Sequence, residues 1–420
     1  MKTFLYTLFF FLLVTQICFA QWYQQTSGIA DSILEVSFTD SNNGFAVGGG
    51  GVILHTTNGG TNWIEQSSGT TKKLWGVCFT DINNGTAVGD SGTIVRTTDG
   101  GITWALQSSG TTVTLWSVSF TDSNFGTCVG GNEILGHGII LRTTNGGTNW
   151  TEQFSDTTAT LWGVSFVDTN IGTVVGGIVL HNNNLILRTT NGGTTWIPQS
   201  SGTDGLLFSV SFADDNNGLA VGQSKILHTT NGGTIWNVQL SGTTGYFNRV
   251  SFPDSNNGTV VGQDFGSGLG GILHTTNGGQ EWASQTSGVA KHLWGVCFTD
   301  ANNGTAVGDE GTILHTTNGG VTFVEEEEID EIPTAYFLSS NFPNPFNPST
   351  KIKYSIPKSS FVNLKVYDIL GNEVAALVNE EKPAGSYEIK WNAEGLSSGV
   401  YFYQLKAGVF VSTKKLLLLK

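Results

Sequence analysis

The sequence predicts an all-β protein, in which a seven-bladed β-propeller is followed by a small Ig-like β-sandwich. Two motifs each recur seven times along residues 21–324, with 40 to 46 residues between successive copies of the first motif. Short runs rich in Val, Phe, Thr and Trp alternate with turns rich in Gly, Asn and Asp, which is typical of short strands joined by tight turns. After residue 335 the repeats stop, and longer alternating segments indicate a separate β domain.

The first motif, TTNGGxxW, runs from a strand-like segment into a tight turn and ends on an aromatic residue. Asn-Gly and Gly-Gly pairs favour turns because glycine adopts positive φ without strain. The seven copies end on Trp63, Trp104, Trp150, Trp196, Trp236, Trp282 and Phe323.

The second motif, typified by VSFTDSNNG, keeps the same rhythm and places one Asp in each copy. These residues are Asp40, Asp81, Asp122, Asp168, Asp214, Asp254 and Asp300. Together the two motifs divide each unit into four short strands, typified by LWGVSF, GTAVG, GTILHTT and NWxxQ. A period of about 40 residues with four strands per unit predicts a propeller blade.

Closure of the ring is expected to use the start of the mature chain. QWYQQTSG at residues 21–28 matches NWIEQSSG at residues 62–69, yet it precedes the first complete unit. We therefore expect it to supply the outer strand of the seventh blade. The alternative is that Val321–Glu325 fills that place alone.

The turn pattern Ser/Thr-x-Asp/Asn-x-Gly-x-Thr-Trp resembles the Asp-box of sialidase-type propellers. The fuller unit, FTDxNNGxAVG followed by GxILRTTNGGxxW, is similar to the photosystem II stability and assembly factor family of seven-bladed propellers. The resemblance covers roughly residues 21–323. It supports the fold more than the function, because one propeller frame hosts many functions.

The two ends of the chain indicate export. Residues 1–20 carry one Lys and then an apolar run, which predicts a signal peptide cleaved before Gln21. The acidic run in residues 325–335 predicts a solvated linker. Residues 336–420 contain NFPNPFNPST, VYDILGNEV and LSSGVYFYQLKAG, and they resemble the type A C-terminal sorting domain of the bacterial type IX secretion system.

That resemblance implies passage through the periplasm, recognition of residues 336–420 by the type IX machinery, and release or attachment at the outer cell surface. A stand-alone adhesive sandwich is the alternative for this segment. No apolar run after residue 20 reaches the roughly 20 residues that a membrane helix needs, so we expect no membrane span in the mature chain.

Charge and cysteine usage exclude some partners. The net charge is −14, and an acidic protein lacks the cationic footprint that nucleic acid requires. Cys78, Cys128 and Cys297 are expected to be free and buried, because equivalent positions of separate repeats lie too far apart for a disulfide. We expect no cofactor and no metal site; the DxNNG turns suggest calcium, but Asp and Asn side chains can cap such turns unaided.

A hydrolase is not expected, although the Asp-box resemblance makes a sialidase-like glycosidase the alternative function. Such a site needs an arginine trio, a Tyr–Glu pair and an acidic Asp. Three of the four propeller arginines occupy one repeat-equivalent position, and no non-repeating pair of carboxylates stands out.

A column of basic residues lies three positions before the Asn or Asp of each turn motif. It could form an anion-binding ring, but we favour a structural role in which each basic side chain pairs with the Asp of its own blade, because a buried charge needs a partner. The column is His55, Arg96, Arg142, Arg188, His228, His274 and His315.

The two repeated turn motifs lie in the loops between first and second strands and between third and fourth strands, on one face of the predicted propeller. The candidate ligand site lies on the other face. All length variation falls in the loops between second and third strands, and insertions on one face of a repeat protein often mark its binding face. The entrances to the first strands join that face and carry an aromatic rim flanked by cations. Packing between blades is the alternative role for these rings. The rim comprises Trp75, Trp116, Trp162, Phe208 and Trp294, with Lys72, Lys73, Lys291 and His292 beside it.

The sequence therefore favours an exported, non-enzymatic surface or extracellular propeller that binds an unknown protein or glycan. The alternative is a secreted glycosidase or glycan-recognising enzyme of Asp-box type. An assembly chaperone for a membrane complex is a third hypothesis, which the sorting tail disfavours.

Overall fold

The computed structural model describes residues 22–132, 136–156, 158–179, 182–239, 245–264, 270–321 and 333–419. The chain divides into two compact units, residues 1–323 and 324–420. The expected signal peptide and residues 325–332 of the expected linker lie outside the described residues. Within the described part of the chain, no helix is both long and apolar enough to cross a bilayer.

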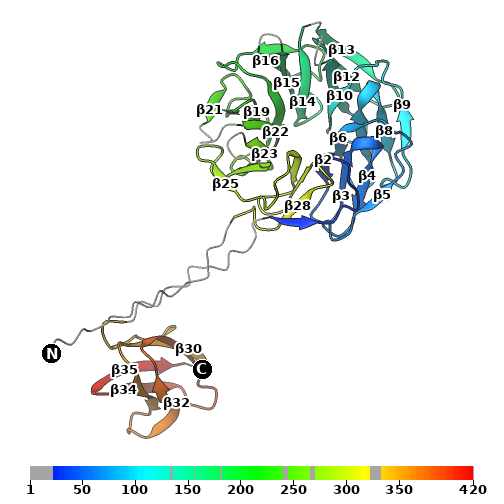
Figure 1. Cartoon of the computed structure of the whole chain (residues 1–420). Helices are drawn as coiled ribbons and strands as arrows, with labels where there is room; N and C mark the ends of the chain where they lie inside the picture. The colour runs from blue at the N-terminus through cyan, green and yellow to red at the C-terminus, as the bar shows by residue number, and fades with distance from the viewer. Residues whose placement is uncertain are drawn as a thin grey trace, which may run out of the picture. The chain divides into compact units, whose positions relative to one another are not determined.

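The first unit is a ring of seven four-stranded antiparallel sheets, so the predicted seven-bladed propeller is confirmed (Figure 1). Blade 1 contains β2 (Ile33–Phe38), β3 (Gly44–Gly48), β4 (Ile53–Thr56) and β5 (Ile64–Gln66). Blade 2 contains β6 (Leu74–Phe79), β7 (Gly85–Gly89), β8 (Ile94–Thr97) and β9 (Ala105–Gln107). Blade 3 contains β10 (Leu115–Phe120), β11 (Gly126–Asn132), β12 (Gly136–Thr143) and β13 (Thr151–Asp156).

Blades 4 to 6 follow the same order. Blade 4 contains β14 (Thr160–Phe166), β15 (Gly172–Ile178), β16 (Asn183–Thr189) and β17 (Ile197–Gln199). Blade 5 contains β18 (Leu207–Phe212), β19 (Gly218–Gly222), β20 (Lys225–Thr229) and β21 (Asn237–Gln239). Blade 6 contains β22 (Gly245–Ser251), β23 (Gly258–Asp264), β24 (Gly270–Thr275) and β25 (Ala283–Gln285).

Blade 7 is completed by the N-terminal strand, as the sequence predicted. It contains β26 (Leu293–Phe298), β27 (Gly304–Gly308), β28 (Ile313–Thr316) and β1 (Tyr23–Gln25), and β1 pairs with β28 antiparallel, Gln24 opposite Leu314. Trp22 takes the place of a repeat tryptophan, because its indole packs on Phe298 and donates to Gln285 Oε1 at 2.8 Å. Phe323, which ends the seventh copy of the motif, lies outside the described residues.

The first strand of each blade is the innermost, since the first strands of neighbouring blades pack against one another around the axis. The phenylalanine ring of each VSF or VCF segment packs beside the glycine of the NNG turn and leaves no room for a side chain there. A Cβ on Gly85 would lie 2.2 Å from Phe79 Cζ, so only glycine admits the ring. The turn residue and the core residue of one blade therefore depend on each other.

One hydrogen bond joins each first strand to the next and closes the ring. The backbone N–H of the motif phenylalanine donates to a Ser or Cys side chain of the preceding blade, at 3.0 to 3.4 Å. The seven pairs are Phe79 with Ser37, Phe120 with Cys78, Phe166 with Ser119, Phe212 with Ser165, Phe252 with Ser211, Phe298 with Ser251 and Phe38 with Cys297.

This ring also accounts for the cysteines. Cys78, Cys128 and Cys297 are free thiols. Cys128 is buried as expected, whereas Cys78 and Cys297 are partly accessible and occupy the acceptor position that serine holds in the other blades. Burial raises the pKa of the Cys297 thiol to about 11, so it remains protonated at neutral pH. These thiols are part of the packing between blades.

The second unit is a β-sandwich, as predicted. One sheet contains β29 (Phe337–Leu338), β30 (Ser349–Ile356) and β33 (Gly385–Asn392), and the other contains β32 (Glu373–Lys382), β31 (Ser360–Tyr367), β34 (Gly399–Ala407) and β35 (Phe410–Leu418). Both sheets contribute to one buried core that includes Tyr354, Trp391, Leu364 and Tyr403. The alternating burial along β30 and β34 is the pattern of strands with one face in a core.

Replacing Trp22 with Ala is predicted to lower the free energy of unfolding of the propeller by about 3 to 5 kcal/mol, because it removes a large buried ring and leaves a cavity. Gln24, in the same strand, is exposed, so Gln24→Ala is the matched control. Urea unfolding of the mature chain followed by tryptophan fluorescence measures both. Equal stability of the two variants would show that β1 does not close the ring.

Candidate functional site

The basic column lies between blades, and its arginines form no direct ion pair with the aspartates among the described residues. The charges of Asp81, Asp122 and Asp168 act at longer range, where they oppose the lowering of the pKa of Arg96, Arg142 and Arg188 by burial. Arg142 donates to Thr127 Oγ1 of its own blade at 2.8 Å and to the Thr169 carbonyl oxygen of the next blade at 2.6 Å. Its guanidinium also lies over the Phe166 ring of that blade, 4.7 Å from the ring centre. Arg96 and Arg188 repeat this arrangement on Phe120 and Phe212.

The carboxylate oxygens of these aspartates accept hydrogen bonds from the backbone of their own turns. They therefore form no direct ion pair with the basic column among the described residues. Asp40 Oδ1 accepts from the backbone N–H groups of Asn42 and Asn43 at 2.7 and 2.9 Å, and the same geometry recurs in the other blades. These bonds hold the pKa of Asp40 below its usual value. Among the described residues, no group of three His, Cys, Asp or Glu side chains is placed to hold a metal ion.

The histidines of the column occupy the repeat-equivalent positions of the arginines and pack against Thr and Phe side chains. His274 and His315 share hydrogen bonds with Thr259 and Thr305 through Nδ1, each at 2.9 Å. His55 stacks on Phe45, with ring centres 4.1 Å apart. Burial lowers the pKa of His55, His228, His274 and His315, so these rings are neutral at pH 7 and give no cationic ring.

The predicted aromatic rim gathers at the axis and lines one cavity of about 560 Å³, which we call the aromatic bowl. All seven blades contribute to its wall: Leu34, Trp75, Trp116, Trp162, Val179, Leu206, Phe208, Tyr246, Asn248, Arg249, His292 and Trp294. Trp75 is 4.7 Å from Trp116 and 6.4 Å from Trp294 between ring centres, and Trp162 meets Phe208 edge-on at 5.5 Å. The rings therefore form two groups in contact, Trp116–Trp75–Trp294 and Trp162–Phe208–Tyr246, around an open space.

Short polar contacts fix the orientation of three indoles. Trp75 Nε1 donates to Asp90 Oδ1 at 2.7 Å, and Trp294 Nε1 donates to Asp309 Oδ1 at 2.8 Å. Trp116 Nε1 donates to the carbonyl oxygen of Gly131 at 3.2 Å. Asp90 and Asp309 lie in connections between second and third strands, and Gly131 lies near the end of the second strand β11, so the orientation of these rings is set from the face that carries these connections.

The floor of the bowl carries one ion pair. Arg249 Nε donates to Glu35 Oε2, and both side chains are about nine-tenths buried, with 14% and 13% of their surfaces exposed. Burial raises the pKa of Glu35 and the Arg249 charge opposes that rise. Below the pair, a second cavity of about 210 Å³ follows the axis between serines of the first strands, and Arg249 lines both cavities.

Of the predicted cations, only His292 lines the bowl, where its ring stacks on Trp294 with centres 4.1 Å apart. Lys73 lies outside it, over the Trp75 ring at 4.7 Å. Lys291 pairs with Glu310 at 2.5 Å, and Lys72 is exposed beside a different recess. The structure thus brings together the five aromatic residues and His292, and leaves the three lysines at or beyond the edge.

Sequence reasoning missed Leu34, Leu206, Tyr246, Asn248 and the Glu35–Arg249 pair. An alignment of the first strands would have found the pair: the residue after the rim position is Glu35, Gly76, Ser117, Gly163, Ser209, Arg249 and Gly295. A Cβ on Gly295 would lie 2.9 Å from Glu35 Cα, so small residues are needed where these strands converge. Two charged side chains in such a ring mark a departure from the repeat.

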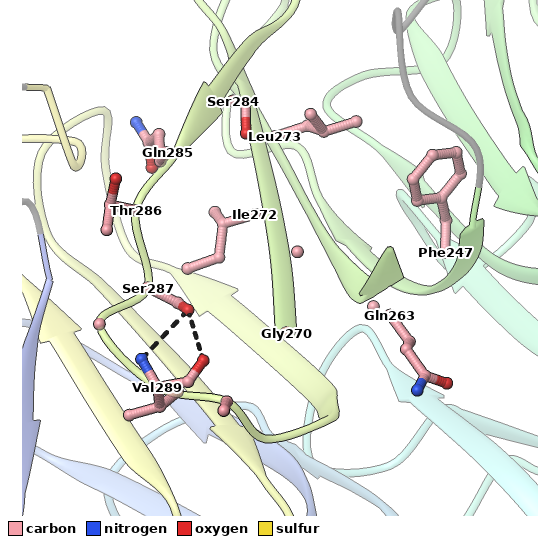
Figure 2. A pocket seen from close by; sticks show the side chains of 14 residues that line it. Phe247, Gln263, Gly270, Ile272, Leu273, Ser284, Gln285, Thr286, Ser287 and Val289 are labelled. Atoms are coloured by element: carbon pink, nitrogen blue, oxygen red, sulfur yellow. Dashed lines mark hydrogen bonds between the residues drawn. The ribbon is translucent and has the colours of Figure 1, made fainter. Parts of the chain in front are cut away.

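A separate recess of about 440 Å³ lies at blade 6 (Figure 2). Figure 2 shows Ser287 Oγ bonded to both the N–H and the carbonyl oxygen of Val289. Blades 1 and 2 have similar recesses with the same serine turn at Ser68 and Ser109. No titratable side chain is among the described residues that line the blade 6 recess, so the bowl is the stronger candidate.

Arg142→Ala is predicted to lower the stability of the mature chain by about 2 kcal/mol, because two hydrogen bonds to a buried charged group are lost. Arg142→His is the matched variant, since four blades carry His at this position, and it should retain most of the stability. Differential scanning calorimetry measures both changes in Tm. An unchanged Tm for Arg142→Ala would contradict the structural role.

Comparison with solved structures identifies similar propellers. The structure "YCF48 bound to D1 peptide" is 19% identical, with 71% of this chain and 96% of that chain covered and a TM-score of 0.58. YCF48 from Cyanidioschyzon merolae is also 19% identical, covering 70% and 98%, with a TM-score of 0.57. The WD40 propeller of Doa1 is 13% identical, covering 71% and 97%, with a TM-score of 0.53. At these identities the likeness shows the fold alone.

Comparison with curated proteins gives no match. Comparison with protein families gives two matches. Residues 340–419 match the secretion system C-terminal sorting domain. Residues 66–154, 150–243 and 199–287 match the family described as photosynthesis system II assembly factor YCF48. The chain therefore belongs to the YCF48 family of propeller proteins and carries a C-terminal sorting domain of the type IX secretion system.

Proposed function

We propose that the mature chain is a non-enzymatic binding protein, delivered through the periplasm to the cell surface or the medium, which holds a protein or glycan ligand in the aromatic bowl. The observation that carries the proposal is that the blades diverge in sequence where their first strands meet at the axis, and that this divergence forms a cavity lined by rings. Pockets with mostly apolar walls and a few polar groups are the usual form of ligand sites.

The sorting domain supports the export half of the proposal, because this domain type serves a secretion system. The D1 peptide bound to YCF48 supports the binding half, since one relative of the same fold takes a polypeptide ligand. A role in assembling a membrane complex is less consistent with a sorting domain that directs the chain beyond the cell.

The sialidase-like alternative needs an arginine trio, a Tyr–Glu pair and an acidic Asp, whereas Arg249 is the one arginine, and no aspartate is present, among the described residues that line the bowl and the cavity below it. Glu35 is the one carboxylate among the described residues that line the bowl and the cavity below it, and it is paired with Arg249. A paired, buried carboxylate is occupied by its cation, so binding without turnover is the function that we propose.

Deletion of residues 336–420 is predicted to abolish export in a bacterium with a type IX secretion system and to leave the propeller in the periplasm. Immunoblots of the medium, the outer membrane and the periplasm measure this. Since the two units have separate cores, the truncated chain should keep the Tm of the propeller, which serves as the folding control. Unchanged export would contradict the proposed route.

Binding is tested by applying the mature chain to a glycan array, a displayed random peptide library and a fluorogenic sialoside. We expect a ligand from one of the first two panels and no sialoside turnover. Val179→Lys places a charge at an exposed position of the bowl and should abolish binding, whereas Ile102→Lys, at an exposed turn of blade 2 on the opposite face, should not. Turnover, or equal binding by the two variants, would contradict the proposed function.

A further inference from the structure

The chemistry of the bowl narrows the class of ligand. Resting on the proposed function, we propose that the bowl holds a large apolar side chain, aromatic or branched aliphatic, of an extended polypeptide, and that sugars do not bind there. The inference rests on which polar atoms of the wall are already bonded, on the composition of the wall, and on the charges at its edge.

Three of the four indole N–H groups of the wall already donate within the protein and are unavailable to hydroxyl groups of a ligand. Those of Trp75, Trp116 and Trp294 donate to Asp90, the Gly131 carbonyl oxygen and Asp309 respectively. A sugar presents several hydroxyl groups that lose their water partners when it binds, and each one needs a replacement in the site. These three tryptophans therefore present their apolar ring faces to a ligand, and not their N–H donors.

Several polar atoms of the floor are also bonded within the protein. Arg249 pairs with Glu35, and Asn248 Nδ2 donates to the Leu293 carbonyl oxygen at 2.8 Å and contacts the His292 ring. A sugar that bonded to Arg249 Nε, Glu35 Oε2 or Asn248 Nδ2 would have to displace these contacts. An apolar group can rest on the floor and leave them intact.

The rest of the wall is apolar. Leu34 and Leu206 are at most 7% exposed and Val179 is 43% exposed, and all three line the cavity together with the aromatic rings. The cavity of about 560 Å³ is large enough for one bulky side chain and its neighbours. Because hydrogen bonds and ring contacts fix Trp75 and Trp294, little side-chain entropy is lost when this surface is covered.

The edge of the bowl favours a polypeptide over a free apolar molecule. Lys73 lies over Trp75, and the Lys291–Glu310 pair includes the residue next to His292 of the wall, so charges of both signs lie near this part of the edge. An apolar core within a polar, charged rim is the usual anatomy of a protein–protein interface. Large aromatic or aliphatic groups that enter a desolvated pocket commonly dominate the affinity of such interfaces.

The test selects random dodecapeptides on the folded mature chain and compares the best binder with its variants by isothermal titration calorimetry. We expect the selected peptides to share one Trp, Phe, Leu or Ile. Its replacement by Ala should weaken binding at least tenfold, as should Val179→Lys in the protein, with Ile102→Lys unchanged. Trp116→Ala should weaken binding and Trp116→Phe should retain most of it, with Tm recorded for each variant.

The other outcomes separate the two proposals. Binding of an oligosaccharide or a fatty acid that Val179→Lys abolishes would overturn the apolar side-chain proposal and leave the bowl as a binding site. Selected peptides that lack a shared apolar residue would also overturn it. Peptide binding that Val179→Lys leaves unchanged, or the absence of any ligand, would overturn the proposed function as well.

Discussion

The propeller depends on the hydrogen bond that joins the first strand of each blade to the first strand of the next blade. In every blade the N–H of the motif phenylalanine reaches a Ser or Cys of the preceding blade, and the seventh such bond, from Phe38 to Cys297, returns to the start. The same phenylalanine fills the space that the turn glycine leaves open and, in blades 3 to 5, supports the arginine of the preceding blade. The repeated residues therefore serve contacts between blades, and the regular spacing of the repeat follows from that.

This constraint separates structural from candidate functional residues. The turn motif, the DxNNG turn and the basic column are occupied by neighbouring blades or by their own backbone, so they have little to offer a ligand. The first strands meet at the axis, where each contributes at least one side chain to a shared space and the residue type differs between blades. Aromatic rings and a single ion pair line that space, and two of the acceptors that orient the rings, Asp90 and Asp309, come from connections between second and third strands.

Most of the fold could be predicted from the sequence because the spacing of the repeated motifs gives the length and number of the blades. Trp22 and its neighbours also match the outer strand of other blades. The partners of the column could not be predicted, since the motifs align residues within one blade whereas Arg142 bonds across to the next. The aromatic rim was found by its equivalence between repeats. Its floor was missed because Glu35 and Arg249 are 214 positions apart and meet only when the ring closes.

The most direct test of the central claim, that binding takes place at the axis where the repeats diverge, is a crystal structure of the mature chain with a bound ligand. The account predicts ligand density inside the aromatic bowl, against Trp116 and Phe208 and above an intact Glu35–Arg249 pair. Density over the TTNGGxxW turns of the opposite face, with the bowl left to solvent, would contradict it.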